Sequence, residues 1–268
     1  MTIAGSRGSG RTRHTLISLA LPLAVAVIVI GGWQSYVSLS GVSSLSLPGP
    51  GEVLQRVIAD APLLVDNAWV TLRAVLLGYL CAVILGGLIA ALVHASTIVE
   101  RAITPWLVVS QMIPLPAIAP LFVLWTGFDI RPRLMLIALV CFFPIAVAMI
   151  DGLRAADPAL LDVLRTMRAS RWERFWMAQL PAALPATFSG LRVAAAFAVL
   201  GAVFGEWVGS NAGLGYLIIA FNSQLKTADM LGVVAVLSLI GVALYSSVTL
   251  VERLVLPWYH AERRGRSR

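Results

Sequence analysis

The sequence predicts an all-α polytopic membrane protein with about six transmembrane helices and a cytoplasmic helix pair. Of its 268 residues, 59% are apolar and only 12% are charged, whereas about 25% are charged in an average soluble domain. The charges are grouped and leave charge-free stretches of about 20 residues, the length of a helix that crosses a hydrocarbon core of about 30 Å. The lysines and arginines are also shared unequally between alternate connections. An ordinary soluble domain and a disordered chain are excluded, because neither tolerates so much apolar surface.

Six windows are long and apolar enough to cross the membrane: 15–36, 71–94, 102–125, 133–150, 186–208 and 230–254. An even number of spans leaves both termini on one side, and that side receives 15 of the 20 lysines and arginines. Because Lys and Arg are enriched in cytoplasmic segments, we expect both termini in the cytoplasm. The net charge of +7 therefore indicates topology. Nucleic acid is not an expected partner, since no basic stripe lies beside exposed aromatic residues.

The domain organisation follows from these spans. Basic tails at 1–14 and 259–268 flank one transmembrane domain at 15–258. We expect the first span to be uncleaved, because its apolar run is too long for a signal peptide and lacks a clear cleavage site. Two outer connections should hold short helices. One covers Glu52–Ile58 after a turn cluster of Pro and Gly, and the other lies within 209–229, which is too short and polar to span.

The longest cytoplasmic connection, residues 151–185, is expected to form two short helices. Asp157 can cap the first of them, which has a proline in its first position. Ser170 and Glu173 have the spacing of a capping box that begins the second helix. Pro181 is expected to end that helix, so that a compact pair would protrude from the membrane.

The first helix of the pair carries an apolar ridge that arginines surround. The ridge has the spacing of one helix face: Leu160, Leu161, Leu164 and Met167. The arginines around it are Arg165, Arg168, Arg171 and Arg174. Such a surface suits docking into a partner's groove, although a helix pair that packs on its own bundle has the same periodicity. Periodicity alone leaves both interpretations open.

Longer patterns around this loop resemble a known family. Asp162–Leu164, Arg168 and Ala178–Pro181 have the spacing of the cytoplasmic motif of ABC importer permeases. Further segments are similar to the branch that includes nitrate, sulfonate, taurine and thiamine-precursor permeases: Pro181–Pro185 with Ser189–Arg192, Gly205–Glu206 with Gly213–Tyr216, and Gln111–Pro114 with Ala119–Phe122. The resemblance covers about residues 47–258.

The resemblance implies the permease subunit of an ATP-driven importer in the bacterial inner membrane. Such permeases form dimers, here expected to be a homodimer, dock a cytoplasmic loop on an ABC ATPase dimer, and receive substrate from an external binding protein. By position, the residues that couple to the ATPase would be Leu160, Leu161, Asp162, Leu164, Arg165, Arg168 and Pro181. The implied substrate is a small polar molecule or anion, of the nitrate, sulfonate, taurine, thiamine-precursor or riboflavin type.

The chain itself is not expected to be an enzyme or to hold a cofactor. It has no Gly-x-x-x-x-Gly-Lys-[Ser/Thr] phosphate loop, so ATP would be used by the partner ATPase subunit. An intramembrane enzyme would need a nucleophile and base or a metal cluster, but the three histidines are scattered and no metal-ligating motif occurs. An ion-coupled secondary transporter is the closer alternative, although it usually has ionisable residues at the midplane. A scaffold that transports nothing is a third.

The loop motif departs from the family at a position that is sensitive to backbone conformation. Arg168 stands where the family has a glycine, while Asp162 replaces a glutamate and Val163 and Leu164 replace alanines. The glycine suits a left-handed turn, which costs other residues about 1–2 kcal/mol. The arginine therefore implies either a different turn or a tolerated strain.

Candidates for the translocation pathway come from two spans. Prolines interrupt the third span and free backbone carbonyls, which is tolerated in a membrane where the backbone is buried in protein or lines a cavity. The candidates are Ser110, Gln111 and Pro114 in that span and Gly201, Gly205 and Glu206 in the fifth. Gly201 and Gly205 let two helices approach closely, whether within one chain, in a dimer or along the pathway. Glu206 is costly unless paired or hydrated, and it either serves binding or gating or holds the loop that contains Asn211.

Overall fold

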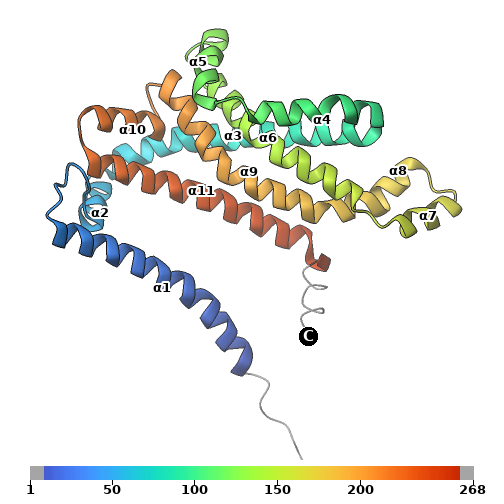
Figure 1. The fold of residues 1–268 in the computed structure, drawn as a ribbon, viewed down its shortest axis with the longest axis horizontal. Coiled ribbons are helices and arrows are strands. Elements are labelled where there is room, and N and C mark those ends of the chain that lie inside the picture. The colour runs from blue at the N-terminus through green and yellow to red at the C-terminus, as the bar shows by residue number, and fades with distance from the viewer. Residues whose placement is uncertain (1–8, 260–268) are drawn as a thin grey trace, which may run out of the picture. The chain divides into compact units, whose positions relative to one another are not determined.

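The computed structural model describes the backbone of residues 9–259 and, within it, the side chains from residue 20 onward except residue 22. Every regular element in this range is a helix (Figure 1). Most of the two predicted basic tails lies outside the described residues. The chain divides into two compact units, which are considered separately.

The first unit comprises the described residues up to Ala61 together with Phe221–Gly232. It contains α1 (Ser9–Ser40), α2 (Pro50–Ala59) and the beginning of α11 (Thr227–Val255). The position of α2 confirms the short helix predicted at Glu52–Ile58. The hydroxyl of Thr227 donates to the carbonyl oxygen of Leu45 at 2.5 Å, which ties the start of α11 to the loop after α1.

A small charged cluster forms inside this first unit. Asp60, directly after α2, hydrogen-bonds the carboxyl group of Asp229, with Arg56 and Lys226 close enough to act on it electrostatically. The pKa of Asp60 is raised above its usual value, first because burial disfavours the charged form and then because of Asp229. The two basic residues oppose this shift but do not cancel it.

The second unit comprises Pro62–Ala220 and the chain from Val233 onward. Its core lies between α3 (Ala61–Ala95), α6 (Arg131–Arg154), α9 (Leu180–Gly209) and the rest of α11. Its largest cluster of buried apolar side chains comprises Ala74, Val75, Ala82, Ile137, Cys141, Ile145, Phe188, Ala194, Ala195, Ala198, Ala202, Leu244, Val248 and Leu256. Outside this cluster, most apolar side chains of α3 and α11 are exposed, as expected for helices that face lipid, whereas those of α6 are buried or half-buried.

Small residues bring α6 and α9 into close contact. A Cβ atom at Gly201 would lie 2.8 Å from Cα of Ile137, and one at Gly205 would lie 2.9 Å from Cα of Arg133. Both distances are too short for real carbon contacts, so only glycine fits. The small residues of the predicted fifth span are therefore used in packing within the chain.

The predicted third span is not one helix. α4 (Thr97–Gln111) and α5 (Leu115–Thr126) meet at 102°, with the break around Pro114. Proline cannot donate a backbone hydrogen bond, and Pro114 has extended backbone angles (φ −65°, ψ 118°). Pro120, by contrast, lies inside α5. Five helices in the described chain are long and apolar enough to span, or six if the bent pair counts as one span.

The loop between the fourth and fifth predicted spans begins as expected. Asp157 accepts a hydrogen bond from the Ala159 amide at 2.9 Å and caps α7 (Pro158–Thr166). The capping box is also present. The Ser170 amide donates to Glu173 at 2.6 Å, and the Glu173 amide donates to the Ser170 hydroxyl at 3.2 Å.

The expectation that Pro181 ends the second helix is wrong. α8 (Arg171–Arg174) continues through the π-helical turn η1 (Phe175–Gln179) into α9. Together the three form one helical stretch of 39 residues, Arg171–Gly209. The Leu180 amide donates to the Phe175 carbonyl, five residues earlier, so the wide turn comes directly before the proline. Because the hydrogen-bond pattern already widens directly before Pro181, the N–H that proline lacks does not interrupt the helix, and the helix continues into the membrane span. Only α7 is a separate helix of the loop.

Candidate functional site

The exposed apolar surface of α7 differs from the predicted ridge. Leu160, Val163 and Met167 are 46%, 54% and 73% exposed, whereas Leu164 is only 9% exposed. Leu161 is half-buried. Leu164 therefore packs on its own chain and does not belong to the accessible ridge, although it is only about 40° around the axis from Leu160. Leu160, Val163 and Met167 form the exposed apolar face of α7.

The turn after α7 resolves the departure at Arg168. This residue has φ 58°, so the arginine adopts the left-handed conformation that the family's glycine favours. Its amide donates to Arg165 O at 2.9 Å, and the Ala169 amide donates to Leu164 O at 2.9 Å. These two bonds are those of a Schellman motif, with Arg168 at the position usually occupied by glycine. The expected turn is thus kept, and the strain is tolerated.

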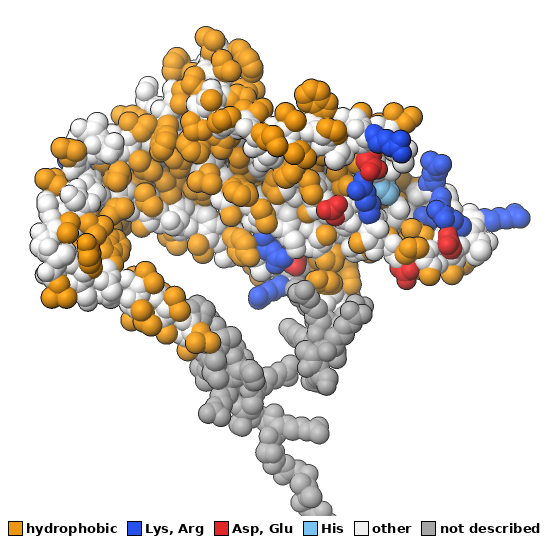
Figure 2. All heavy atoms as spheres, viewed as in Figure 1, with side chains coloured by type: hydrophobic (Ala, Val, Ile, Leu, Met, Phe, Trp, Pro, Cys, Tyr) orange, Lys and Arg blue, Asp and Glu red, His pale blue; other side chains and the backbone are white. Residues whose placement is uncertain are grey.

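Arginines gather at the end of the second unit formed by α7 and α8 (Figure 2). Arg165 pairs with Asp162 at 2.7 Å on the surface of α7. No carboxylate within salt-bridge distance is found for Arg168, Arg171 or Arg174 among the side chains that the structure describes. This end of the unit therefore carries three arginines that have no carboxylate within salt-bridge distance in the described part of the chain.

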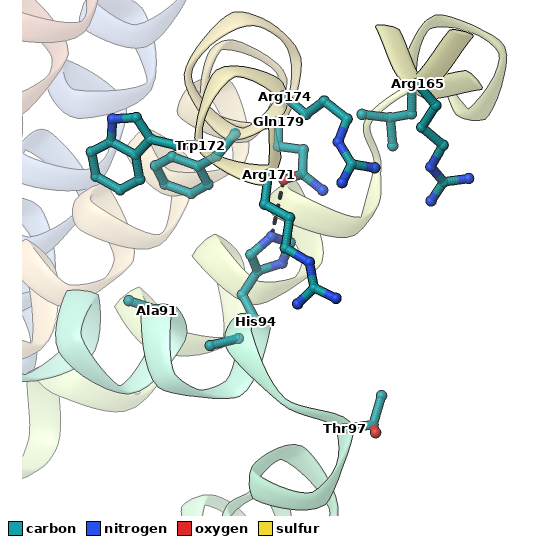
Figure 3. A pocket seen from close by; sticks show the side chains of 11 residues that line it. Ala91, His94, Thr97, Arg165, Arg171, Trp172, Arg174 and Gln179 are labelled. Atoms are coloured by element: carbon teal, nitrogen blue, oxygen red, sulfur yellow. Dashed lines mark hydrogen bonds between the residues drawn. The ribbon is translucent and has the colours of Figure 1, made fainter. Parts of the chain in front are cut away.

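A cavity of about 760 Å³ opens behind α7 (Figure 3). It lies between the carboxyl end of α3 and the segment from α7 to η1, with Arg165, Arg171 and Arg174 around it. On its inner side, His94 Nε2 lies 3.1 Å from Gln179 Oε1. Sequence reasoning did not place α3 here, because His94 and Gln179 are 85 residues apart.

The break between α4 and α5 forms a second cavity, of about 260 Å³. Ser110 and Gln111 line it together with Leu139 of α6 and Phe204 of α9. The Gln111 amide group donates to the Leu139 carbonyl at 3.4 Å. Two of the predicted pathway residues thus lie beside one space, and Pro114 lies at the bend that creates it.

Glu206, in contrast, is fully buried in a hydrogen-bond network. Its carboxylate accepts hydrogen bonds from the Thr71 hydroxyl at 2.8 Å and the Gly215 amide at 2.7 Å, with Arg133 Nη1 at 4.0 Å. Thr71 also accepts from the Leu214 amide at 2.8 Å. These contacts are those of the loop-holding alternative, and they leave a direct role of Glu206 in transport as a prediction.

Two further polar residues of the second unit, Asn67 and Glu252, were missed by the sequence reasoning. Asn67 Oδ1 accepts from the amide of Gly213, whose φ of 113° requires glycine. Arg192 pairs with the buried Glu252 at 2.8 Å and links α9 to α11. A lone carboxylate in the last predicted span was the available signal for this pair, since such a group needs a partner in lipid.

Comparison with known proteins decides the family. Residues 82–260 match the family described as binding-protein-dependent transport system inner membrane component. The chain belongs to this family. It is therefore an ABC importer permease subunit, a multi-pass inner-membrane component without catalytic activity of its own. This membership excludes the ion-coupled alternative and implies ATPase and binding-protein partners.

Relatives and a solved structure agree with this assignment. The permease is 38% identical to a "Probable ABC transporter permease protein" of Haemophilus influenzae, over 87% of this chain and 95% of that one. It is 34% identical to the formylaminopyrimidine transport permease protein ThiX of Halalkalibacterium halodurans, over 84% and 90%. A chain of the inward-facing MetNI methionine ABC transporter matches with a TM-score of 0.62 and 18% identity, over 72% of this chain and 96% of that one, which confirms the fold.

Proposed function

We propose that the permease forms the translocation pathway as a homodimer and couples to a dimeric cytoplasmic ATPase through α7. The observation that carries the proposal is the exposed apolar face of α7, which is held at one end by the Asp157 cap and at the other by the turn at Arg168. A short helix with a fixed start and end can transmit a displacement without unravelling. Of the predicted coupling residues, we assign contact with the ATPase to Leu160, Asp162, Arg165 and Arg168, and we add Val163 and Met167.

The other three predicted coupling residues have supporting roles in this proposal. Leu164 and Leu161 hold α7 against its own chain, because they are buried and half-buried. Pro181 lies beyond η1 at the start of α9. If α7 and α8 are displaced, the movement would reach α9 through the turn that contains Pro181.

A charge on the exposed face of α7 tests the coupling. Val163→Asp should weaken co-purification of the ATPase about thirty-fold, because truncation or disruption of an interface hot spot costs about 2 kcal/mol or more. Thr166→Asp is the matched control, since it adds the same charge to the same helix about 60° around the axis from Val163. Equal ATPase retention by the two variants, with both folded, would contradict the proposal.

For the pathway, we propose that substrate passes the cavity at the bend between α4 and α5. Ser110 and Gln111 offer hydrogen bonds there, and Pro114 fixes the bend. Gly201 and Gly205 let α9 approach α6 closely, and this approach brings Phe204 of α9 to the wall of the cavity. Gln111→Leu should reduce uptake while ATPase association stays normal. Unchanged uptake would remove this cavity from the pathway.

The substrate class we propose is a small polar molecule or anion. Relatives are named for the transport of formylaminopyrimidine, riboflavin, aliphatic sulfonates and taurine. The decisive measurement is a thermal-shift screen of the cognate binding protein against these compounds and nitrate. Stabilisation by none of them would refute the proposed class.

The topology we propose places both termini and α7 in the cytoplasm, because 15 of the 20 lysines and arginines then lie inside. Thiol labelling of a cysteine introduced at Ala159, which is exposed, tests it. Labelling by a membrane-impermeant reagent should require opened cells, and labelling of intact cells would refute the orientation.

A further inference from the structure

The cavity behind α7 is basic, and its charge is not neutralised by its own lining. Arg165, Arg171 and Arg174 surround it, and no Asp or Glu is among the residues that line it. Asp162 balances part of the charge of Arg165 from the surface of α7. Arg174 Nε makes only a long bond of 3.5 Å to the Ser170 carbonyl. The cavity therefore has the charge of an anion site.

Apart from Arg165, the residues that line this cavity are not those proposed to meet the ATPase. Leu161 and Arg165 line it, and they follow one another at i and i+4 on α7. At 100° per residue, Leu161 and Arg165 project about 120° and about 160° away from Met167, the middle residue of the exposed apolar face. One side of α7 thus faces the cavity, and the other side faces outward. Arg171 and Arg174, which are not among the residues proposed to meet the ATPase, consequently have a function that docking of the apolar face does not explain.

Aromatic residues beside the arginines indicate what kind of anion the site takes. Trp172 is 68% exposed and Trp176 is 51% exposed, with ring centroids 5.5 Å apart in a T-shaped arrangement. Phe175 stacks against Trp172 at 5.9 Å and lines the cavity. Exposed tryptophans at the end of a membrane span are typical of the headgroup region, where the ring sits between acyl chains and water. Binding of a soluble anion would not require the exposed aromatic side chains of Trp172 and Trp176 beside the site.

We propose that this cavity binds the headgroup of an anionic phospholipid of the cytoplasmic leaflet. Arginine is suited to the phosphodiester because its planar guanidinium donates two parallel hydrogen bonds. Arg171 and Arg174 hold the phosphate, His94 and Gln179 offer polar groups at the inner wall, and the apolar walls formed by Ala91 and Leu161 contact the glycerol and first methylenes. The inference rests on the cytoplasmic placement of α7 given under the proposed function.

Native mass spectrometry of the full-length permease in a non-ionic detergent tests this proposal. Wild-type protein should bind phosphatidylglycerol more tightly than phosphatidylcholine. The double variant Arg171→Gln/Arg174→Gln should bind phosphatidylglycerol about thirty-fold more weakly, which corresponds to about 1 kcal/mol for each arginine near an anionic surface. Arg253→Gln is the matched control. Arg253 is exposed on α11, lies outside the cavity lining and is also placed in the cytoplasm by the proposed topology.

Several results would overturn the proposal. Equal phosphatidylglycerol binding by the double variant and the control would remove the arginines from the site. Displacement of the lipid by an equal concentration of inorganic phosphate would show a site for free anions. If the glutamine pair does not fold, Arg171→Lys/Arg174→Lys keeps both charges but loses the bidentate geometry, and it should bind several-fold more weakly. Unchanged affinity of the lysine pair would contradict the proposed phosphate contacts.

A separate measurement keeps this proposal distinct from the proposed coupling. Co-purification of the ATPase in nanodiscs of phosphatidylcholine should be the same for the arginine double variant and wild type. Loss of the ATPase with unchanged lipid binding would assign the arginines to the ATPase contact, which overturns the lipid site and leaves the coupling role of α7 intact. Loss of coupling in Val163→Asp with normal lipid binding supports both proposals independently.

Discussion

Alanine at Gly201 should push α6 and α9 apart. The new Cβ atom would lie 2.8 Å from Cα of Ile137, and this atom belongs to the backbone of α6, so it cannot turn away as a side chain would. Ordinary van der Waals contact begins at 3.4 Å. The two helices would therefore have to separate by about 0.6 Å at this point, since well-packed interiors have no free space to absorb a methyl group.

The expected cost is about 1–3 kcal/mol for one methyl group forced into a packed interface. Alanine also favours the helix by up to about 1 kcal/mol relative to glycine, which offsets part of this cost. Gly87→Ala on α3 separates the two contributions, because a Cβ atom there meets nothing within 4 Å. Gly87→Ala should be neutral or stabilising, and the difference between the two variants gives the steric cost alone.

The thiol of Cys141 provides a local assay. It is fully buried in α6, and its sulfur lies 3.2 Å from the Ala194 carbonyl of α9. In a Cys81→Ser background, which removes the exposed thiol, a thiol-reactive dye reports the separation of these helices during heating. Gly201→Ala should lower the transition temperature by several degrees relative to Gly87→Ala. Equal transition temperatures would refute the reasoning that this contact is a tight one within the chain.

Three further predictions concern single residues. Arg168→Gly should stabilise the permease against thermal unfolding by about 1 kcal/mol, because it relieves the left-handed strain. An unchanged or lower transition temperature would refute the strain interpretation. Glu206→Ala leaves the donors of Thr71 and Gly215 unpaired and should cost about 1–3 kcal/mol for each in thermal unfolding, whereas an unchanged transition would refute the network. The raised pKa of Asp60 means that the folded state favours the neutral carboxyl group. The contribution of Asp60 to the free energy of unfolding is therefore fully present below its pKa in the unfolded chain, about 3.8, and is lost as pH rises through its pKa in the folded state. Asp60→Asn should therefore be more stable than wild type at neutral pH and equal to it below about pH 4, and a constant difference across this range would contradict the assignment.

Features that depend on neighbouring residues could be predicted from the sequence. The apolar runs placed the membrane helices, and the caps at Asp157 and Ser170 placed the starts of α7 and α8, because a cap is a local hydrogen bond. The break near Pro114 was also recognisable. Its 102° angle was not, since prolines only remove donors and the surrounding helices set the direction.

Features that depend on distant residues could not be predicted. The partners of Glu206 include Thr71, which is 135 residues away in the sequence. The burial of Leu164 depends on what α7 packs against, so periodicity could place it on a face but not say which face was covered. The effect of Pro181 was misjudged because proline normally ends a helix, and no local pattern announces that a wide turn precedes it.

That wide turn has a geometrical consequence for coupling. A π-turn contains one residue more than the α-turn it replaces, so the side chains of α8 are rotated by about 100° around the axis relative to an uninterrupted α-helix. The stretch of 39 residues is about 58 Å long as a continuous rod. Removing one residue from η1 would shorten this rod by only about 1.5 Å but would turn Arg171 and Trp172 to another side of it. The one inserted residue therefore sets the direction in which the side chains of α8 face around the helix axis.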